Sequence, residues 1–226
     1  MNVILHGAQS TAADWAPVKA LLTPAEVPNR RGRDGVPLPA DYSLRTEIDD
    51  LHAVLDRHEN PTLIGHSYGG LVALLTAQER NDLKALVLYE PAIGIDPEAV
   101  EDYANALARG DRDLALEIMV VRLAGESSFR EAAPDLWEAA KGLLDTTLHE
   151  LRAVTGYRYE PPKLDIPVTV IVGERTDHLF GPAARDIVRD TNGTLVTIEG
   201  AGHVAHLTHL EEFVEIVQPS REATPS

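Results

Sequence analysis

Cysteine is absent from this chain of 226 residues. Disulfide bonds, thiolate zinc sites and a cysteine nucleophile are therefore all excluded. Basic residues are also scarce, because 20 Lys and Arg stand against 36 Asp and Glu, and the formal net charge is -16. A nucleic-acid or anionic-membrane partner is not expected, since both need a basic surface. Aromatic residues make up only 5%, so an aromatic cage for a cation is not indicated either.

Long apolar stretches are missing as well. No segment approaches the ~18 apolar residues of a membrane-spanning helix. The first residues, MNVILHGAQS, carry no basic segment and an apolar run too short for a signal peptide, so we expect a strand there. We therefore expect a cytoplasmic protein without membrane contact, a monomer or a homodimer, whose partner is a small-molecule substrate.

Short apolar stretches alternate with helical patterns along most of the chain. The stretches expected to form strands are 3–5, 62–64, 85–89, 168–172 and 194–198. The segments with a helical spacing of apolar residues are 12–22, 44–58, 69–80, 182–189 and 210–217. This alternation is typical of an α/β fold, in which helices cover both faces of a mostly parallel sheet.

One region interrupts the alternation. Residues 95–159 contain no strand-like stretch, and their apolar residues recur at helical intervals. We expect three or four helices there, inserted between two strands as a lid. The core would then comprise 1–94 and 160–219, and the polar residues 220–226 would form a disordered tail. Most apolar lid residues would form the lid's own core; the candidates to line a pocket are Met119, Leu123 and Trp137.

Gly65-His66-Ser67-Tyr68-Gly69 fits the pattern Gly-x-Ser-x-Gly. The pattern alone is weak, but a strand directly before it and a helix directly after it are what a nucleophilic serine turn requires. Gly65 and Gly69 carry no Cβ, which lets the strand and the helix approach closely. The Ser67 hydroxyl would then project at the carboxyl end of the sheet, where α/β folds form ligand sites. The alternative is a tight turn with an idle serine.

A serine nucleophile needs a base, and the base needs an orienting acid. His203 lies in a glycine-containing loop just after the last expected strand, and Asp177 follows the strand before it. The chain order Ser67, Asp177, His203 is that of hydrolases with this serine turn. We therefore predict His203 as the base and Asp177 as the acid. The alternative for His203 is a solvated loop histidine.

Attack on a carbonyl carbon creates an oxyanion, which backbone N–H groups can stabilise. One predicted donor is the N–H of Tyr68, at the start of the helix, where the helix dipole also favours negative charge. The other predicted donor is the N–H of Ala8, after the first strand. His6 is expected to order this loop rather than to act as a second base.

No cofactor and no metal ion are expected. His203, His206 and His209 are spaced by three residues, but on a helix this spacing places side chains around the axis, so they would not converge on a metal. The basic loop 28–35, PNRRGRDG, could bind a substrate carboxylate through Arg30, Arg31 or Arg33. We expect these arginines to be solvated instead.

Together these motifs resemble the α/β-hydrolase superfamily. The matching segments run from about residue 3 to 217 and are HGAQ, NRRGRDG, GHSYGG, LVLYEPA, VGERTDH and GAGHVAHL. The resemblance implies a serine hydrolase, similar to esterases and lactonases, with a helical lid over the site and a small ester, thioester or lactone as substrate. The same fold and triad could also serve C–C bond hydrolysis, perhydrolysis, lyase or cyclisation chemistry, or a ligand receptor of the hydrolase fold.

One departure from this resemblance concerns the acid. In many relatives the acid follows its strand as Gly-Glu-x-Asp, whereas the segment from Gly173 to Asp177 carries one extra residue. Some members of the superfamily take their acid from the strand after the nucleophile helix, and LVLYEPA places Glu90 at that point. Asp177 is our prediction, and Glu90 is the alternative acid.

Overall fold

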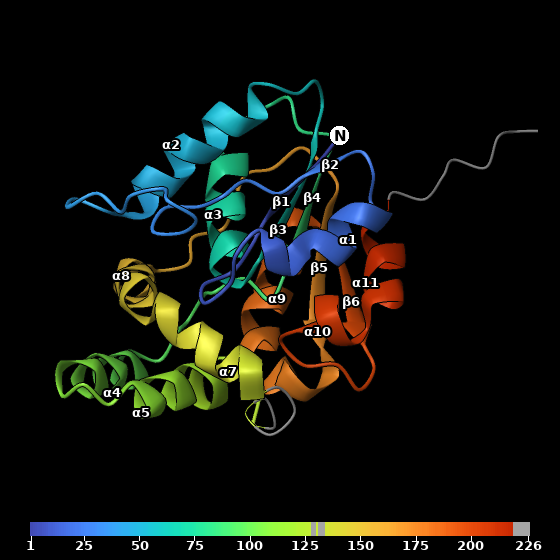
Figure 1. The fold of residues 1–226 in the computed structure, drawn as a ribbon. Helices are drawn as coiled ribbons and strands as arrows, with labels where there is room; N and C mark the ends of the chain where they lie inside the picture. The colour runs from blue at the N-terminus through green and yellow to red at the C-terminus, as the bar shows by residue number, and fades with distance from the viewer. Residues whose placement is uncertain (128–129, 131–133, 219–226) are drawn as a thin grey trace, which may run out of the picture.

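The computed structural model describes residues 1–127, 130 and 134–218, so the predicted tail 220–226 lies outside the described residues. Within them, six strands form one sheet in the order β2-β1-β3-β4-β5-β6, and every pairing is parallel (Figure 1). The strands are β1 (Asn2–Leu5), β2 (Ala25–Glu26), β3 (Thr62–His66), β4 (Ala85–Tyr89), β5 (Val168–Gly173) and β6 (Thr194–Ile198). The predicted α/β fold is confirmed; the two-residue β2 is an edge strand that the sequence pattern did not indicate.

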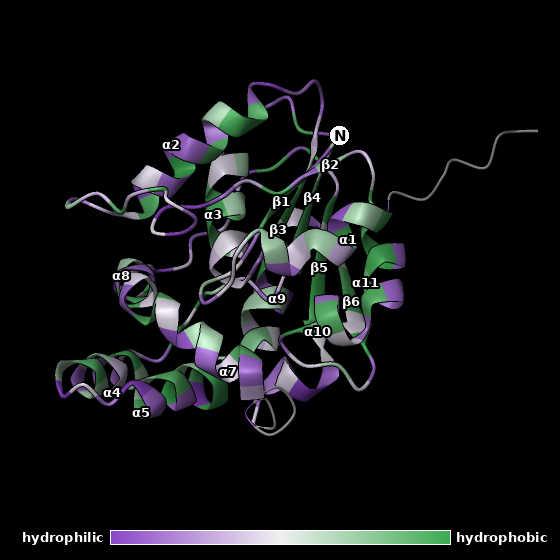
Figure 2. Ribbon diagram, viewed as in Figure 1, coloured by the Kyte–Doolittle hydropathy of each residue, from purple (hydrophilic) through white to green (hydrophobic). Residues whose placement is uncertain are grey.

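Helices cover both faces of the sheet. One face packs against the 3₁₀-helix η1 (Ala13–Trp15), α1 (Ala16–Leu21), α10 (Ala205–Thr208) and α11 (Leu210–Val217). The other face packs against α2 (Leu44–Leu55), α3 (Ser67–Ala77) and α9 (Asp177–Thr191). Successive strand residues point to opposite faces, so Val3 and Leu5 join one core and Ile4 joins the other. Because both faces are buried, the central strands β3, β4 and β5 are mainly apolar rather than alternating (Figure 2).

A group of helices is inserted between β4 and β5. Its elements are α4 (Pro97–Ala108), α5 (Arg112–Glu117), the π-helix η2 (Ile118–Leu123), α7 (Pro134–Ala140), the 3₁₀-helix η3 (Lys141–Leu143) and α8 (Leu144–Thr155). Tyr103, Leu116 and Trp137 belong to a separate apolar core that these helices share. Figure 1 shows the insertion at the end of the molecule toward which the strands run, beyond their carboxyl ends.

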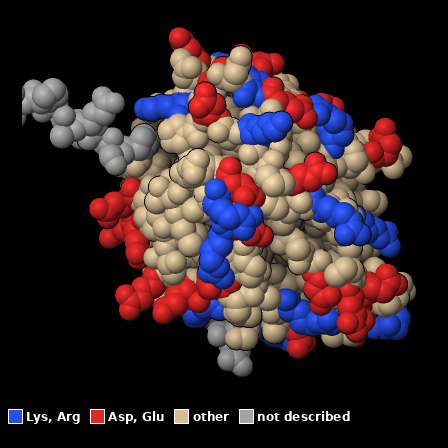
Figure 3. Space-filling view, turned by 180° about the vertical axis from the view of Figure 1, so that it is seen from behind, with Lys and Arg blue, Asp and Glu red and all other residues tan. Residues whose placement is uncertain are grey.

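Charged side chains of both signs are intermingled on the face seen in Figure 3. Exposed ion pairs include Arg45 with Asp49 at 2.5 Å and Arg189 with Asp186 at 2.6 Å. Such surface pairs add little to stability because water screens them. Within the described residues, no helix combines the length and the apolar character needed to cross a membrane.

Two glycines let α3 pack closely on the sheet. A Cβ at Gly65 would lie 2.6 Å from the Gly69 carbonyl oxygen and 2.7 Å from Ala73 Cβ. A Cβ at Gly69 would overlap the carbonyl oxygens of Leu5 and His6, which belong to the end of β1 and the residue after it. These neighbours are backbone atoms or short side chains, so they cannot move aside cheaply. The close approach predicted from the glycine spacing is confirmed.

Gly69→Ala should therefore lower the free energy of unfolding by about 1–3 kcal/mol, because the added methyl group overpacks the α3–β1 contact. Gly142→Ala is the matched control, since a Cβ at that position meets nothing within 4 Å. Urea denaturation of both variants measures the difference. Equal free energies of unfolding for the two variants would show that α3 has room to shift.

Candidate active site

Ser67 occupies the joint between β3 and α3. Its φ is +52°, in the left-handed region that residues with a Cβ rarely adopt, and its side chain is almost fully buried. A strained non-glycine residue at such a turn is held there by the surrounding structure, and it is the conformation expected of a serine turn that exposes a nucleophile. The predicted strand–turn–helix context of Ser67 is present.

The His203 ring contacts Glu90, the alternative acid of the sequence analysis. Glu90 follows β4 directly, has a φ of +44° and is completely buried. Its Oε2 accepts a hydrogen bond from His203 Nδ1 at 2.5 Å. Because a carboxylate can only accept, this contact selects the imidazole tautomer with its proton on Nδ1 and leaves Nε2 free to take up a proton.

The second oxygen of Glu90 holds the carboxylate in place. Glu90 Oε1 accepts from the Gly173 backbone N–H at 2.8 Å and from the Thr176 hydroxyl at 2.5 Å. Gly173 ends β5, and Thr176 belongs to the 3₁₀-helix η4 (Glu174–Thr176). A buried carboxylate without donors would be strongly unfavourable, so these bonds and the His203 bond account for its position.

The prediction that Asp177 contacts and orients the His203 ring is wrong. Asp177 is the first residue of α9 rather than a loop residue, and its partly exposed carboxylate accepts from Arg185 Nη1 at 2.8 Å. The extra residue after Gly173 completes the turn of η4, which brings Thr176 inward and turns Asp177 outward. We expected helix 182–189 to begin at Pro182, but α9 begins five residues earlier and Pro182 lies inside it.

The loop that carries His203 is fixed by aromatic residues that sequence reasoning missed. The Tyr89 hydroxyl accepts from the Ala205 backbone N–H at 2.9 Å and donates to the Gly202 carbonyl, so it clamps the loop on both sides of His203. The Phe180 ring stacks on the His203 ring with a centroid distance of 4.5 Å and an angle of 11°. Tyr89 belongs to an apolar stretch and Phe180 follows Leu179, so the local sequence does not distinguish either from an ordinary core residue.

His66 connects the Ser67 turn with the His203 loop. Its Nε2 donates to the His203 carbonyl oxygen at 2.9 Å, and the two rings are 4.6 Å apart. Among the described residues, no hydrogen bond joins the Ser67 hydroxyl to the His203 ring. Such bonds are often long until a substrate is bound.

His206 and two arginines of the basic loop are packed in the interior. His206 is buried, its ring stacks on Trp15 at 4.1 Å, and burial together with His203 lowers the pKa of His206 to about 3. Within the described residues, no three potential ligands are arranged to hold a metal ion. The expectation of solvated arginines is wrong for Arg30 and Arg33, which are both 2% exposed and ion-paired.

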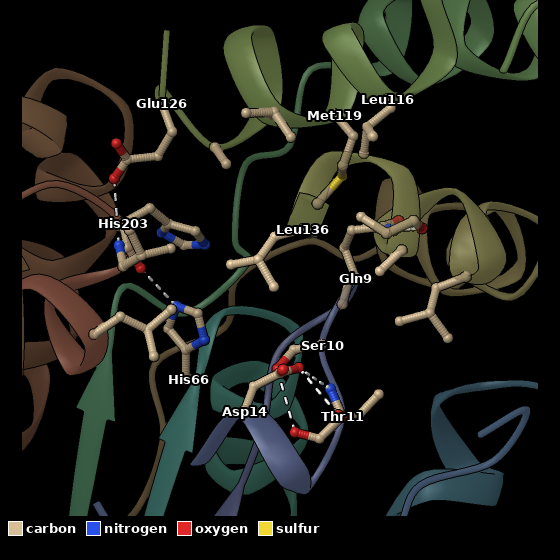
Figure 4. Close-up of a pocket in the computed structure, with 18 of the residues that line it drawn as sticks. Gln9, Ser10, Thr11, Asp14, His66, Leu116, Met119, Glu126, Leu136 and His203 are labelled. Atoms are coloured by element: carbon tan, nitrogen blue, oxygen red, sulfur yellow. Dashed lines mark hydrogen bonds between the residues drawn. The ribbon is translucent and has the colours of Figure 1, made fainter. Parts of the chain in front are cut away.

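A cavity of about 330 Å³ lies between the insertion and the carboxyl ends of the strands (Figure 4). The insertion supplies an apolar wall, with Leu116, Met119, Leu136 and Leu143 among its residues. The loop after β1 and the adjoining helix η1 supply a polar wall, which consists of Gln9, Ser10, Thr11 and Asp14. His203 and His66 also line the cavity. Of the predicted pocket residues, Met119 is therefore placed correctly, whereas Leu123 and Trp137 are in the core of the insertion.

The two predicted oxyanion donors flank the Ser67 turn. Ala8 lines the cavity, and a Cβ at the adjoining Gly7 would come within 3.0 Å of Ser67 Cβ. Tyr68 is the second residue of α3, so its N–H belongs to the first turn, where backbone donors have no partner within the helix. His6 is buried and its Nδ1 donates to the Gly7 carbonyl at 3.0 Å, which agrees with an ordering role.

Comparison with known families agrees with this geometry. The profile of a family described as "Alpha/beta hydrolase family" matches residues 3–216, which is nearly the whole chain. The chain belongs to this family. It is thus an enzyme of the α/β-hydrolase type, as the resemblance of its motifs implied.

Three relatives of this hydrolase illustrate the range of the family. Lipase LipV of Mycobacterium tuberculosis is 29% identical over 86% of this chain and 70% of its own length. The pimeloyl-[acyl-carrier protein] methyl ester esterase of Aeromonas hydrophila is 26% identical over 96% of this chain and 93% of its own. An alpha/beta hydrolase of Sphaerobacter thermophilus has a solved structure with a TM-score of 0.75 and 25% identity, covering 94% of this chain and 91% of its own.

The two candidate acids of the hydrolase can be separated by matched amide substitutions. Glu90→Gln keeps the side-chain shape but can present an N–H to His203 Nδ1, which favours the wrong tautomer and should lower kcat by ~10²–10⁴-fold. Asp177→Asn removes only a partly exposed ion pair with Arg185 and should change kcat less than about twofold. Steady-state hydrolysis of p-nitrophenyl butyrate measures both. A larger loss for Asp177→Asn would return the acid to Asp177.

Proposed function

We propose that this hydrolase cleaves a small ester, thioester or lactone through an acyl-enzyme formed on Ser67. The proposal is carried by one observation: the buried Glu90–His203 pair adjoins the Ser67 turn under a largely apolar cavity. A base with an oriented ring next to a hydroxyl on a strained turn is the arrangement that acyl transfer requires. The substrate class of the two esterase and lipase relatives supports the same reaction.

In the first half of the reaction, Ser67 Oγ attacks the acyl carbon while His203 Nε2 takes the hydroxyl proton. The Glu90 carboxylate stabilises the imidazolium that results. The backbone N–H groups of Ala8 and Tyr68 donate to the oxyanion of the tetrahedral intermediate. His203 then gives its proton to the leaving oxygen or sulfur, and the acyl group remains on Ser67.

In the second half, a water molecule attacks the acyl-enzyme and His203 accepts one of its protons. A second oxyanion forms on the same N–H donors. When this intermediate collapses, His203 returns the proton to Ser67 Oγ, and the carboxylic acid leaves. Each step uses only side chains and backbone groups of this chain, so the proposal needs neither a metal ion nor an organic cofactor.

The cavity supports a neutral and mainly aliphatic acyl group. Its volume of about 330 Å³ is near the lower end of the range of about 300–1,000 Å³ that is usual for small-molecule sites. Among the described residues that line it, Asp14 and Glu126 are acidic and none is Lys or Arg. A carboxylate on the acyl group would therefore meet like charges without a Lys or Arg partner in the described lining. We propose that the insertion 95–159 acts as the lid that sets the length of the acyl group.

Ser67→Ala should fold normally and lose esterase activity by ~10³-fold or more, because the acyl-enzyme cannot form. Labelling by a fluorophosphonate probe should disappear with it. Ser10→Ala is the control, since Ser10 lines the described cavity but lies outside the Ser67 turn. Mass spectrometry of the labelled peptide identifies the modified serine, and a label on any residue other than Ser67 would refute the nucleophile assignment.

Met119→Ala should shift the preferred p-nitrophenyl ester toward longer acyl chains, because it removes a side chain from the apolar wall. We expect about a tenfold change in the ratio of kcat/KM for octanoate over butyrate. Val121→Ala, on the same helix η2 but more than one-third exposed, should leave this ratio unchanged. If both variants keep the wild-type ratio, the insertion does not select the acyl length.

A further inference from the structure

Two buried arginines hold the backbone of the loop that follows β1. Arg30 Nη1 donates to the carbonyl oxygens of Gly7 at 3.0 Å and of His6 at 3.2 Å. Arg33 Nε donates to the carbonyl oxygen of Ser10 at 2.6 Å. Three carbonyl groups of a five-residue loop are thus bound by guanidinium groups that lie in the interior of the protein.

One carboxylate of the insertion joins the two arginines. Glu150, on α8, is completely buried; its Oε1 accepts from Arg30 Nη2 at 2.5 Å and its Oε2 from Arg33 Nη2 at 2.8 Å. Glu47, on α2, accepts from Arg30 Nε at 3.2 Å and Nη2 at 3.1 Å. Two positive and two negative charges therefore balance. Burial works to lower the pKa of Arg30, but Glu150 and Glu47 hold that pKa well above its usual range.

The bond to Gly7 fixes the direction of the Ala8 N–H. The Gly7 carbonyl and the Ala8 N–H belong to one peptide plane and point in opposite directions when the bond is trans. Among the described peptide bonds, only Thr23–Pro24 is cis. Arg30 Nη1 and His6 Nδ1 both donate to the Gly7 oxygen at 3.0 Å, so the carbonyl points toward Arg30 and the N–H points away from it. Ala8 itself lines the cavity.

We infer that Arg30, held by Glu150 of the insertion, is a positioning residue for the oxyanion donor Ala8 N–H. The inference rests on the proposed function, because it assigns a purpose to a donor that only acyl transfer uses. Arg30 does not touch the substrate. It acts by holding the Gly7–Ala8 peptide in the orientation that binds the oxyanion, so that no reorientation is needed as charge develops.

The loop is also fastened to the insertion by a second contact. Gln9, whose φ is +54°, accepts from the Thr147 hydroxyl at 2.8 Å through Oε1 and donates to the Ala140 carbonyl through Nε2. Thr147 is one turn before Glu150 on α8. The insertion thus holds the loop directly at Gln9 and, through the arginines, on both sides of it.

Arg31 is a natural control for Arg30. It is the next residue in the chain, and its guanidinium pairs with Asp50 at 2.6 Å and 2.8 Å. It is about one-third exposed, and no hydrogen bond joins it to the described loop residues 6–10. Arg31→Lys therefore replaces the same residue type and also keeps the charge, but it does not affect the Gly7–Ala8 peptide.

The test compares Arg30→Lys with Arg31→Lys. Lysine keeps the charge at position 30 but cannot reach the two carboxylates and the two carbonyls at once. For p-nitrophenyl butyrate, Arg30→Lys should lower kcat by about 10- to 100-fold and change KM by less than about threefold, because one oxyanion donor is misdirected. Binding of an alkyl trifluoromethyl ketone, which forms an oxyanion on Ser67, should weaken by the same factor. Arg31→Lys should change none of these values.

Glu150→Gln provides a second variant in case Arg30→Lys does not fold. It keeps Arg30 but replaces its ion pair with Glu150 by a weaker hydrogen bond, so kcat and ketone binding should fall by smaller factors than in Arg30→Lys. Wild-type kcat and ketone affinity in both variants would overturn the inference, as would a loss that appears in KM alone. A wild-type enzyme whose Ser67 does not react with the fluorophosphonate would instead refute the proposed function, and the inference with it.

Discussion

The hydrogen bond between Glu90 Oε2 and His203 Nδ1 is the constraint around which the site is arranged. A fully buried carboxylate is tolerated only when its oxygens find donors, and the three donors here come from the end of β5, from η4 and from the loop after β6. The ends of three neighbouring strands therefore meet at one side chain. A change in the length of one of these connections would remove one of the three donors from the buried carboxylate.

This constraint also explains why Asp177 is outside the site. The carboxyl end of β5 adjoins both the end of β4 and the His203 loop, so a carboxylate from either strand could approach the ring. Two carboxylates at this point would repel each other. The extra residue of the turn avoids this repulsion. It places the Thr176 hydroxyl where it donates to Glu90, and it places Asp177 at the surface, where its carboxylate accepts from Arg185. The longer side chain of Glu90 then covers the distance to His203.

The sequence predicts the parts of this structure that local patterns determine. Apolar stretches predict the five longer strands, and the glycines around Ser67 predict the close packing of α3, because each depends on residues adjacent in the chain. The acid and the arginine cluster depend on distant contacts instead. In the sequence, Arg30 and Arg33 look like solvated loop residues because the carboxylates that pair with them are distant along the chain. Glu47 is 17 residues from Arg30, and Glu150 is 120 residues from it.

The insertion lines the cavity, and its carboxylates also contact the loops on both sides of the candidate site. Glu150 reaches the loop after β1 through Arg30 and Arg33, whereas Glu126 accepts from the Val204 N–H at 3.3 Å, beside His203, and from Arg175 at 3.2 Å. The loop that carries the proposed oxyanion donor Ala8 and the loop that carries the proposed base His203 are therefore both held by the insertion. A shift of the insertion would change the shape of the cavity and the positions of both loops together, so the proposed mechanism couples substrate fit to catalytic geometry.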